Sequence, residues 1–329
     1  MKVSSAVGVC VLAISLFSSA CTTSPMSVDP PDDDEENPTD PPSTDTEDPY
    51  PIHVDSTDSD APETYKGLPL ELTINAAPTV APVEGSIGVV CIGMSNAFEE
   101  CAEYINQATG AWASDINPAV TIVNCARGGH AIERWIDPSF DDVLWDTCVT
   151  RLADVGLEPR HVKVVLHKAS NQFTTYPNGQ VLPPYPDPDA DYFNFLDNLD
   201  AFALRVPAEF PAVEVVFTTS RSYGGFSTLP QRDEPIGYEQ GHALNVWLED
   251  NPTVAGIAFV WGPYIWAPEC STGITNGIGL CYNRSHYETD GIHPSPSGEA
   301  MIAAAWHQHL LEHDWYRAPS GGPPTTDTE

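Results

Sequence analysis

Between residues 66 and 316, short apolar segments alternate with longer amphipathic ones. The short segments are rich in β-branched residues and cover residues 87–92, 120–123, 162–166, 213–218 and 256–261. Their continuous apolar character is typical of parallel strands that are covered on both faces. The longer segments have helical periodicity and cover residues 97–108, 140–155, 192–204, 238–248 and 297–313. This alternation predicts a three-layer α/β/α sandwich with a five-stranded, mainly parallel sheet, to which residues 69–75 could add a strand at the front.

The first 21 residues have the pattern of an export signal. Lys2 supplies a positive charge, residues 6–17 are apolar, and small residues follow up to Ala20. The apolar run is too short for a membrane-spanning helix, which needs about 20 residues. The small residues that end in Cys21 resemble the lipobox of bacterial lipoproteins, in which this cysteine becomes the mature N-terminus and carries lipid. We therefore expect an exported protein, either lipid-anchored at the cell envelope through Cys21 or secreted.

Acidic residues dominate the composition and are unevenly distributed. The chain has 47 Asp and Glu against 13 Lys and Arg, a formal net charge of −34. Residues 22–65 are acidic and rich in Pro, Ser and Thr, so they cannot bury enough apolar surface to fold and are predicted to form a disordered linker. Residues 317–329 are predicted to form a frayed tail. The charge argues against nucleic-acid binding and against electrostatic docking on anionic membranes, which leaves a lipid anchor as the expected membrane contact.

Six cysteines remain in the part of the chain that is predicted to fold: Cys91, Cys101, Cys125, Cys148, Cys270 and Cys281. An even number in an exported protein predicts disulfides, and six cysteines allow many pairings. Cys270–Cys281 is the simplest pair because it closes a Gly-rich loop, and Cys101–Cys148 would join two predicted helices. Cys91 and Cys125 lie in apolar strand patterns, either as buried thiols or as partners. The absence of paired C-x-x-C motifs makes a zinc ribbon improbable on sequence grounds.

Polar residues follow the predicted strands, at the sheet edge where α/β folds bind ligands. Ser95 lies on a strand-to-helix turn, where it either exposes its hydroxyl beside free helix N–H groups or caps the helix. Gly128 and Gly129 follow the second strand and either let a backbone N–H approach a ligand or form a plain turn. Asn171 follows the third strand, as a hydrogen-bond donor or a turn residue.

The most specific signal is the loop Asp290-Gly291-Ile292-His293-Pro294, before the last predicted helix. A carboxylate three residues from a histidine can hold the imidazole through Nδ1 and leave Nε2 free to act as a base. Together with the Ser95 hydroxyl, Asp290 and His293 provide the three groups of a serine hydrolase.

These motifs together resemble the SGNH (GDSL-type) hydrolase family over about residues 86–311. The turn Gly93-Met94-Ser95-Asn96 is similar to the family's Gly-Asp-Ser-Leu block, with Met and Asn replacing Asp and Leu. Gly129 has the position of the second-block glycine, with Gly128 as the close alternative. Asn171 stands where the third block has its asparagine, and Asp290-x-x-His293 matches the last block.

The resemblance implies a flavodoxin-like sandwich that hydrolyses esters without a metal ion or organic cofactor. Ser95 would be the nucleophile, His293 the base and Asp290 the group that orients it. The N–H groups of Ser95 and Gly129 and the amide of Asn171 would form the oxyanion hole.

The loops after the fourth and fifth predicted strands point to a substrate class. Arg221, Tyr223 and Trp261 lie there, where aromatic rings could stack on sugars or pack the rim, and where Arg221 could contact an acidic sugar or be structural. Because many relatives in that family remove acetyl groups from carbohydrates, we expect hydrolysis of a small acyl ester, in particular acetyl, on a polysaccharide. The alternatives are a non-catalytic glycan-binding surface lipoprotein with the same fold and a lipase-like esterase for longer acyl chains.

Four histidines outside this constellation raise the question of a metal site: His161, His307, His309 and His313. The last three lie near the C-terminus of one predicted helix, where a cationic histidine is favoured by the helix dipole. We therefore expect charged surface histidines there and no metal.

Overall fold

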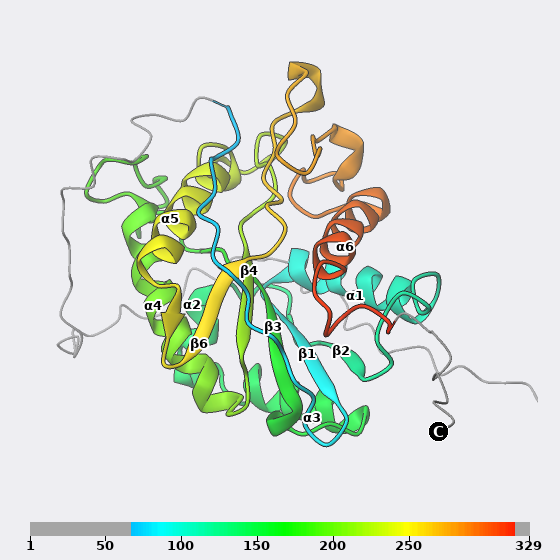
Figure 1. Cartoon of the computed structure of the whole chain (residues 1–329). Coiled ribbons are helices and arrows are strands. Elements are labelled where there is room, and N and C mark those ends of the chain that lie inside the picture. Colours follow the sequence, from blue (N-terminus) through cyan, green and yellow to red (C-terminus); the bar gives the residue numbers. More distant parts are fainter. Residues whose placement is uncertain (1–66, 320–329) are drawn as a thin grey trace, which may run out of the picture. The chain divides into compact units, whose positions relative to one another are not determined.

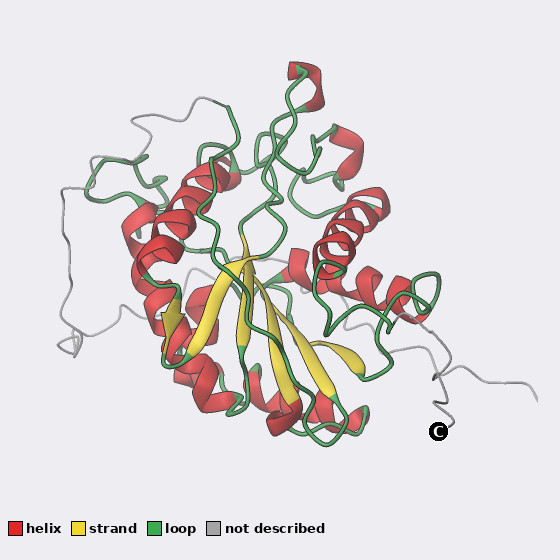
Figure 2. Ribbon diagram, viewed as in Figure 1, coloured by secondary structure: helices red, strands yellow, loops and turns green. Residues whose placement is uncertain are grey.

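A computed structural model describes residues 67–319, in which a six-stranded sheet lies between two layers of helices (Figures 1 and 2). The predicted signal segment 1–21, Cys21 included, and the predicted linker 22–65 lie outside the described residues. Within residues 67–319, no helix combines the length and the apolar character that crossing a bilayer requires.

The five predicted strands are all present and run parallel. They are β1 (Ile87–Ile92), β2 (Val120–Asn124), β3 (Val162–Lys168), β4 (Val215–Thr219) and β6 (Ile257–Trp261). The sheet order is β2-β1-β3-β4-β6-β5, which is the flavodoxin-like order with one added edge strand. That edge strand, β5 (Thr253–Val254), is antiparallel and too short to leave a sequence pattern.

The predicted additional strand at residues 69–75 is wrong. These residues form no strand and lie along a helix, where the Thr73 N–H donates to Asn245 and the Asn75 amide donates to the Leu248 carbonyl. Helix α5 (Ile236–Asp250), and not a neighbouring strand, therefore supplies the partners of Thr73 and Asn75.

The helices cover both faces of the sheet (Figures 1 and 2). One face carries α1 (Ser95–Thr109) and α6 (Pro296–Leu310), and the other carries α2 (Ile132–Ile136), α3 (Trp145–Asp154), α4 (Asp191–Glu209) and α5 (Ile236–Asp250). Strand β1 shows why both faces are apolar: Val89 packs into the core on the α1 side and Val90 into the core on the α4 side. The helix predicted from residue 140 begins only at Trp145, because the chain first makes a 3-10 turn at Pro138–Phe140.

Three disulfides join the six cysteines, and only one of the two predicted pairs is confirmed. Cys270–Cys281 is present, whereas the predicted Cys101–Cys148 bond is wrong. The observed pairs are Cys91–Cys101, from β1 to α1, and Cys125–Cys148, from the end of β2 to α3. Cys101 and Cys148 lie in the hydrophobic cores on opposite faces of the sheet, which keeps them apart.

The predicted tail starts at least two residues too early. Arg317 pairs with Ile116 in an antiparallel bridge, and the Ala318 N–H donates to the Asp115 carbonyl. The rest of the predicted tail, from residue 320, lies outside the described residues.

Candidate active site

The turn from β1 into α1 places Ser95 at the first position of the helix. A side chain at Gly93 would put its Cβ 2.6 Å from the Ala97 Cβ and 3.1 Å from the Lys168 carbonyl oxygen, so this tight turn requires glycine. Met94 is the N-cap and makes no side-chain cap, which excludes the reading of Ser95 as a capping serine. The N–H of Ser95 is among the first N–H groups of α1, which have no partner within the helix.

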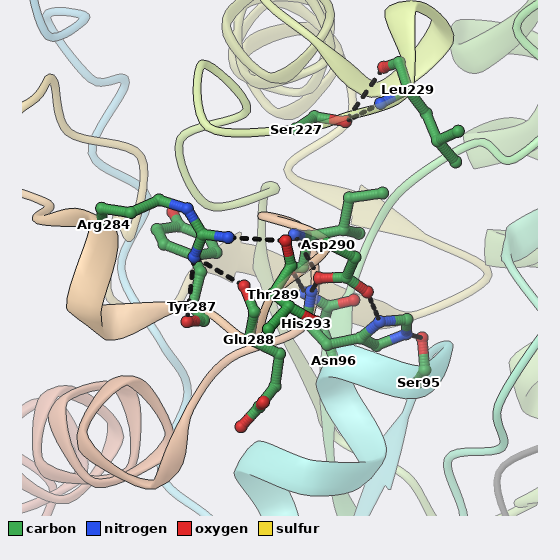
Figure 3. A network of polar contacts seen from close by, with 11 residues as sticks. Ser95, Asn96, Ser227, Leu229, Arg284, Tyr287, Glu288, Thr289, Asp290 and His293 are labelled. Atoms are coloured by element: carbon green, nitrogen blue, oxygen red, sulfur yellow. Dashed lines mark hydrogen bonds and ion pairs between the residues drawn. The ribbon is translucent and has the colours of Figure 1, made fainter.

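A continuous chain of hydrogen bonds connects Ser95, His293 and Asp290 (Figure 3). His293 Nε2 lies 2.9 Å from Ser95 Oγ, and His293 Nδ1 lies 2.5 Å from Asp290 Oδ2. The other oxygen of Asp290, Oδ1, accepts hydrogen bonds from the N–H groups of Ile292 and His293 at 2.8 and 3.1 Å. The same carboxylate therefore shapes the loop and orients the imidazole.

Contacts from three other parts of the chain, one of them in α1, hold this loop in place. The Asn96 amide donates to the Ile292 carbonyl at 2.8 Å, and the Thr228 N–H donates to the Asp290 carbonyl. Arg284 donates to three successive carbonyls of residues 287–289, immediately before Asp290 (Figure 3). Asn96 and Arg284 were not singled out in the sequence, although Asn96 is the direct neighbour of Ser95.

Gly291 occupies the tightest position of the loop. Its φ is +73°, in the left-handed region, and a Cβ there would overlap the Phe226 carbonyl. Only glycine lets the Asp290–His293 loop lie this close to the chain after β4.

The Asp290 carboxylate is electrostatically suited to hold a histidine. Burial alone would raise its pKa, but hydrogen bonds from the Ile292 N–H, the His293 imidazole and the His293 N–H outweigh burial, so the pKa of Asp290 lies below its usual value. An ionised Asp290 favours the imidazole tautomer with hydrogen on Nδ1, which leaves Nε2 to accept from the Ser95 hydroxyl.

Glu99 is a further acidic group close to the triad. It lies one helical turn beyond Ser95 on α1. Burial raises its pKa to about 7; His293 and Lys168 act to lower this pKa, and Glu299 and Glu100 add to the rise. Its Oε2 is buried and has no hydrogen-bond partner among the described residues. The spacing of four residues from Ser95 was the available sequence signal for this residue.

The loop after β2 brings the adjacent glycines Gly128 and Gly129 toward the nucleophile. The Arg127 N–H donates to the Gly93 carbonyl, and a Cβ built on Gly128 would lie 3.9 Å from the Ser95 Cβ. A Cβ on Gly129 would have nothing within 4 Å. Within residues 67–319, neither glycine N–H has an acceptor. An added side chain at Gly128, and not at Gly129, would therefore meet Ser95, and the N–H groups of both glycines are open to a ligand.

Asn171 is held inside the protein by other polar groups. It is 1% exposed, its amide nitrogen donates to Asp191 Oδ1 at 2.9 Å, and its amide oxygen accepts from Asn198 at 2.9 Å. The next two N–H groups along the chain, of Gln172 and Phe173, both donate to Glu133. None of the hydrogen bonds described for Asn171 reaches Ser95 or His293.

A pocket is lined by residues that flank the triad in sequence. Its empty volume is about 310 Å³, counting space open to solvent, and its lining includes Met94 and Asn96 beside Ser95, and Gly291 and Ile292 between Asp290 and His293. Arg221 and Tyr223, both expected to contact substrate, line it. The expectation for Trp261 is wrong: this residue is 6% exposed, and its indole N–H donates to Asn245.

The expectation of cationic histidines on the last helix is also wrong. Burial lowers the pKa of all three histidines, His307, His309 and His313, and that of His309 falls to about 4. The lowered pKa values favour the neutral forms. The rings of His309 and His313 pack against the buried Phe217, and both side chains are half-buried.

Comparison with known proteins finds similarity at the level of solved structures. No protein-family model matches the chain, and no curated protein sequence matches it. The structure is similar to a carbohydrate esterase family 3 protein from Talaromyces cellulolyticus, with 11% identity, a TM-score of 0.43, and coverage of 69% of this chain and 96% of that one. It is also similar to a GDSL-like lipase from Bacteroides thetaiotaomicron, with 12% identity, a TM-score of 0.40, and coverage of 70% and 90%. A lipase/acylhydrolase from Enterococcus faecalis has 12% identity, a TM-score of 0.39, and coverage of 69% and 96%.

Proposed function

We propose that this protein is a serine esterase that hydrolyses a small acyl ester, in particular acetyl, on a carbohydrate. The observation that carries the proposal is the unbroken chain of hydrogen bonds from Ser95 through His293 to Asp290. Its serine is the first residue of α1, whose first N–H groups have no partner within the helix and are available to stabilise an oxyanion.

In the proposed reaction, His293 Nε2 removes the proton from Ser95 as Oγ bonds to the ester carbonyl carbon. The tetrahedral intermediate collapses when the alcohol leaves with the proton from the imidazolium. A water molecule, activated by the same Nε2, then attacks the acyl-enzyme and releases the acid. Asp290 stabilises the imidazolium and keeps its own charge throughout.

The proposed oxyanion hole starts with the N–H groups of Ser95 and Gly128. Asn171 is the proposed third donor, through the amide hydrogen that Asp191 does not use. In that role Asn171→Ala should lower kcat by about 10²–10³ with little change in KM, while Gln172→Ala should be nearly silent. A fall in Tm without loss of kcat would assign Asn171 to the Asp191–Asn198 network alone.

The lining of the pocket is partly charged, which does not suit a long acyl chain. Beside the triad it presents Lys168, Arg221 and Arg232 together with backbone and aromatic groups. A long acyl chain needs an apolar groove, because burying charged groups against hydrocarbon costs free energy. This argues against the lipase-like alternative.

Labelling with a fluorophosphonate tests the catalytic proposal against a glycan-binding role. The wild-type chain should form a covalent adduct and Ser95→Ala should not, while Ser114→Ala, a change at an exposed serine remote from the triad, should label normally. A wild-type chain that never labels would support the non-catalytic alternative. A p-nitrophenyl ester series should then show acetate as the best substrate, and release of acetate from acetylated polysaccharides should follow.

We also propose that the protein is exported and lipid-anchored through Cys21. Three disulfides are typical of proteins that fold in oxidising compartments. The expressed full chain should partition into a detergent phase, and Cys21→Ser should move it to the aqueous phase. Aqueous partitioning of the wild type would contradict the anchor.

A further inference from the structure

The pocket beside the triad is cationic in a chain that is strongly acidic. The whole chain has only 13 Lys and Arg, yet Lys168, Arg221 and Arg232 all line this pocket. Its lining contains no Asp or Glu. In a chain with a net charge of −34, three positive groups around one pocket are not expected from composition alone. This suggests that the pocket has a role that requires positive charge.

Arg221 differs from Lys168 in whether an ion-pair partner balances its charge. Lys168 Nζ forms a buried ion pair with Glu100 at 2.5 Å. Arg221 is 7% exposed, and its described hydrogen bond is a long one, 3.3 Å, from Nη1 to the Asn171 carbonyl. Among the described ion pairs, none includes Arg221. A buried guanidinium with five N–H donors therefore faces the pocket with most of its donors available.

Three carboxylates act on the Arg221 charge, those of Asp191, Glu234 and Glu133, and each accepts hydrogen bonds from other donors; Glu133 Oε1 accepts from the Gln172 and Phe173 N–H groups. Asp191 accepts from Asn171 and Gln240, and Glu234 accepts from the Gly224 N–H and the Trp266 indole. These carboxylates attract the Arg221 charge electrostatically without a described hydrogen bond or ion pair to it. Burial first, and then repulsion by Arg232, lowers the pKa of Arg221 to about 10, so it stays charged at neutral pH.

We propose that this pocket binds a carboxylate on the alcohol part of the substrate, so that the natural ester is an acylated glycan containing uronic acid. The inference rests on the proposed esterase function, in which an acetyl group brings no charge of its own. A carboxylate offers two oxygens and one negative charge, which matches the planar fork of one guanidinium. The pocket is lined by the chain neighbours of Ser95, Met94 and Asn96, and by Gly291 and Ile292 of the loop that carries His293, so the proposal places the carboxylate on the alcohol part of the ester that is cleaved.

A matched pair of substrates isolates the carboxylate. 4-Acetoxybenzoate and 4-acetoxybenzamide carry the same acetyl ester and differ in charge at the para position. The wild-type chain should prefer the benzoate in kcat/KM, and Arg221→Gln should reduce that preference about 10- to 100-fold. Arg221→Lys, which keeps the charge, should retain part of it. Arg151→Gln is the control, because Arg151 also donates to backbone carbonyls, of Asn124 and Ala126, outside the pocket; the preference should not change.

Two outcomes would overturn the inference while leaving the esterase intact. One is a wild type without preference for the benzoate. The other is an equal loss of kcat/KM on both esters in Arg221→Gln, which would assign Arg221 to holding the Asn171 loop.

Binding separates this inference from failure of the esterase proposal, which would appear as no hydrolysis of either ester. Calorimetric titration of Ser95→Ala with 4-acetoxybenzoate should show binding that Arg221→Gln weakens about 10-fold or more. Equal affinity for the benzoate and the benzamide in Ser95→Ala would overturn the carboxylate pocket, whatever the wild type hydrolyses.

Discussion

Replacing Gly291 by alanine tests whether the geometry of the Asp290–His293 loop sets the activity. The change adds one methyl group in the only loop that carries both the base and its carboxylate. Gly291 has φ +73°, and the added Cβ would overlap the Phe226 carbonyl oxygen.

Two separate costs follow from the structure. The left-handed conformation costs an alanine about 1–2 kcal/mol. The overlap adds a displacement, because the Cβ or the carbonyl must move by more than about 1 Å to reach ordinary contact. The contacts of His293 with Asp290 and Ser95 are 2.5 and 2.9 Å and do not survive such a shift. A displacement of about 1 Å can lower a rate about 100-fold.

Gly156→Ala is the matched control. Gly156 has φ +79°, but a Cβ there meets nothing within 4 Å, so this variant carries the same backbone strain without the overlap. Both variants should lose stability in thermal unfolding, and only Gly291→Ala should lose about 100-fold in kcat/KM on p-nitrophenyl acetate. Activity of Gly291→Ala within threefold of wild type, with a fall in Tm no greater than that of Gly156→Ala, would refute this reasoning.

Three further predictions address the triad and its support. Asp290→Asn keeps the shape of the loop but favours the wrong tautomer of His293, so kcat should fall by roughly 10 to 10⁴; activity within twofold of wild type would remove Asp290 from the triad. Because burial raises the pKa of Glu99 from 4.5 to about 7, the stability that its protonated form contributes is complete below about pH 4.5 and is lost as the pH rises through 7. Glu99→Gln should therefore gain Tm relative to wild type at pH 8.5 and not at pH 4.5, and an equal difference at both pH values would contradict this sign. Replacing Cys91 and Cys101 together by alanine opens a loop of sequence separation 10 and should lower the free energy of unfolding by about 3 kcal/mol, measured by denaturant titration; unchanged stability would show that this bond does not constrain the unfolded chain.

Local patterns predicted the parallel strands well because those strands are buried on both faces. Residues 87–92 form a continuous apolar run and are buried throughout in β1. The strand predicted at residues 69–75 is false: apolar and polar residues alternate there, but a helix, and not a strand, supplies the hydrogen-bond partners. The two-residue strand β5 left no pattern to detect.

Pairings between distant residues could not be read from local patterns. Cys101 and Cys148 both lie on helices, and only the placement of α1 and α3 on opposite faces of the sheet separates them. Trp261 ends a strand as expected, yet its side chain packs beside Asn245 and does not reach the rim. Asn171 follows β3 as expected, but the buried Asp191 from α4 engages its amide.

The sequence by itself determined the features that depend on neighbouring residues: the alternation of strands and helices, the turn that exposes Ser95, and the loop in which Asp290 reaches His293 three residues away. Their physical basis is short-range, in the periodicity of apolar side chains, the freedom of glycine and the reach of one carboxylate. Only the tertiary structure decided which distant groups meet. It brought His293 to Ser95 across 198 residues, placed Gly128 near the nucleophile, and gathered Lys168, Arg221 and Arg232 around one pocket. These contacts depend on the order of strands in the sheet and on which face each helix covers, and both arise from packing of the whole chain.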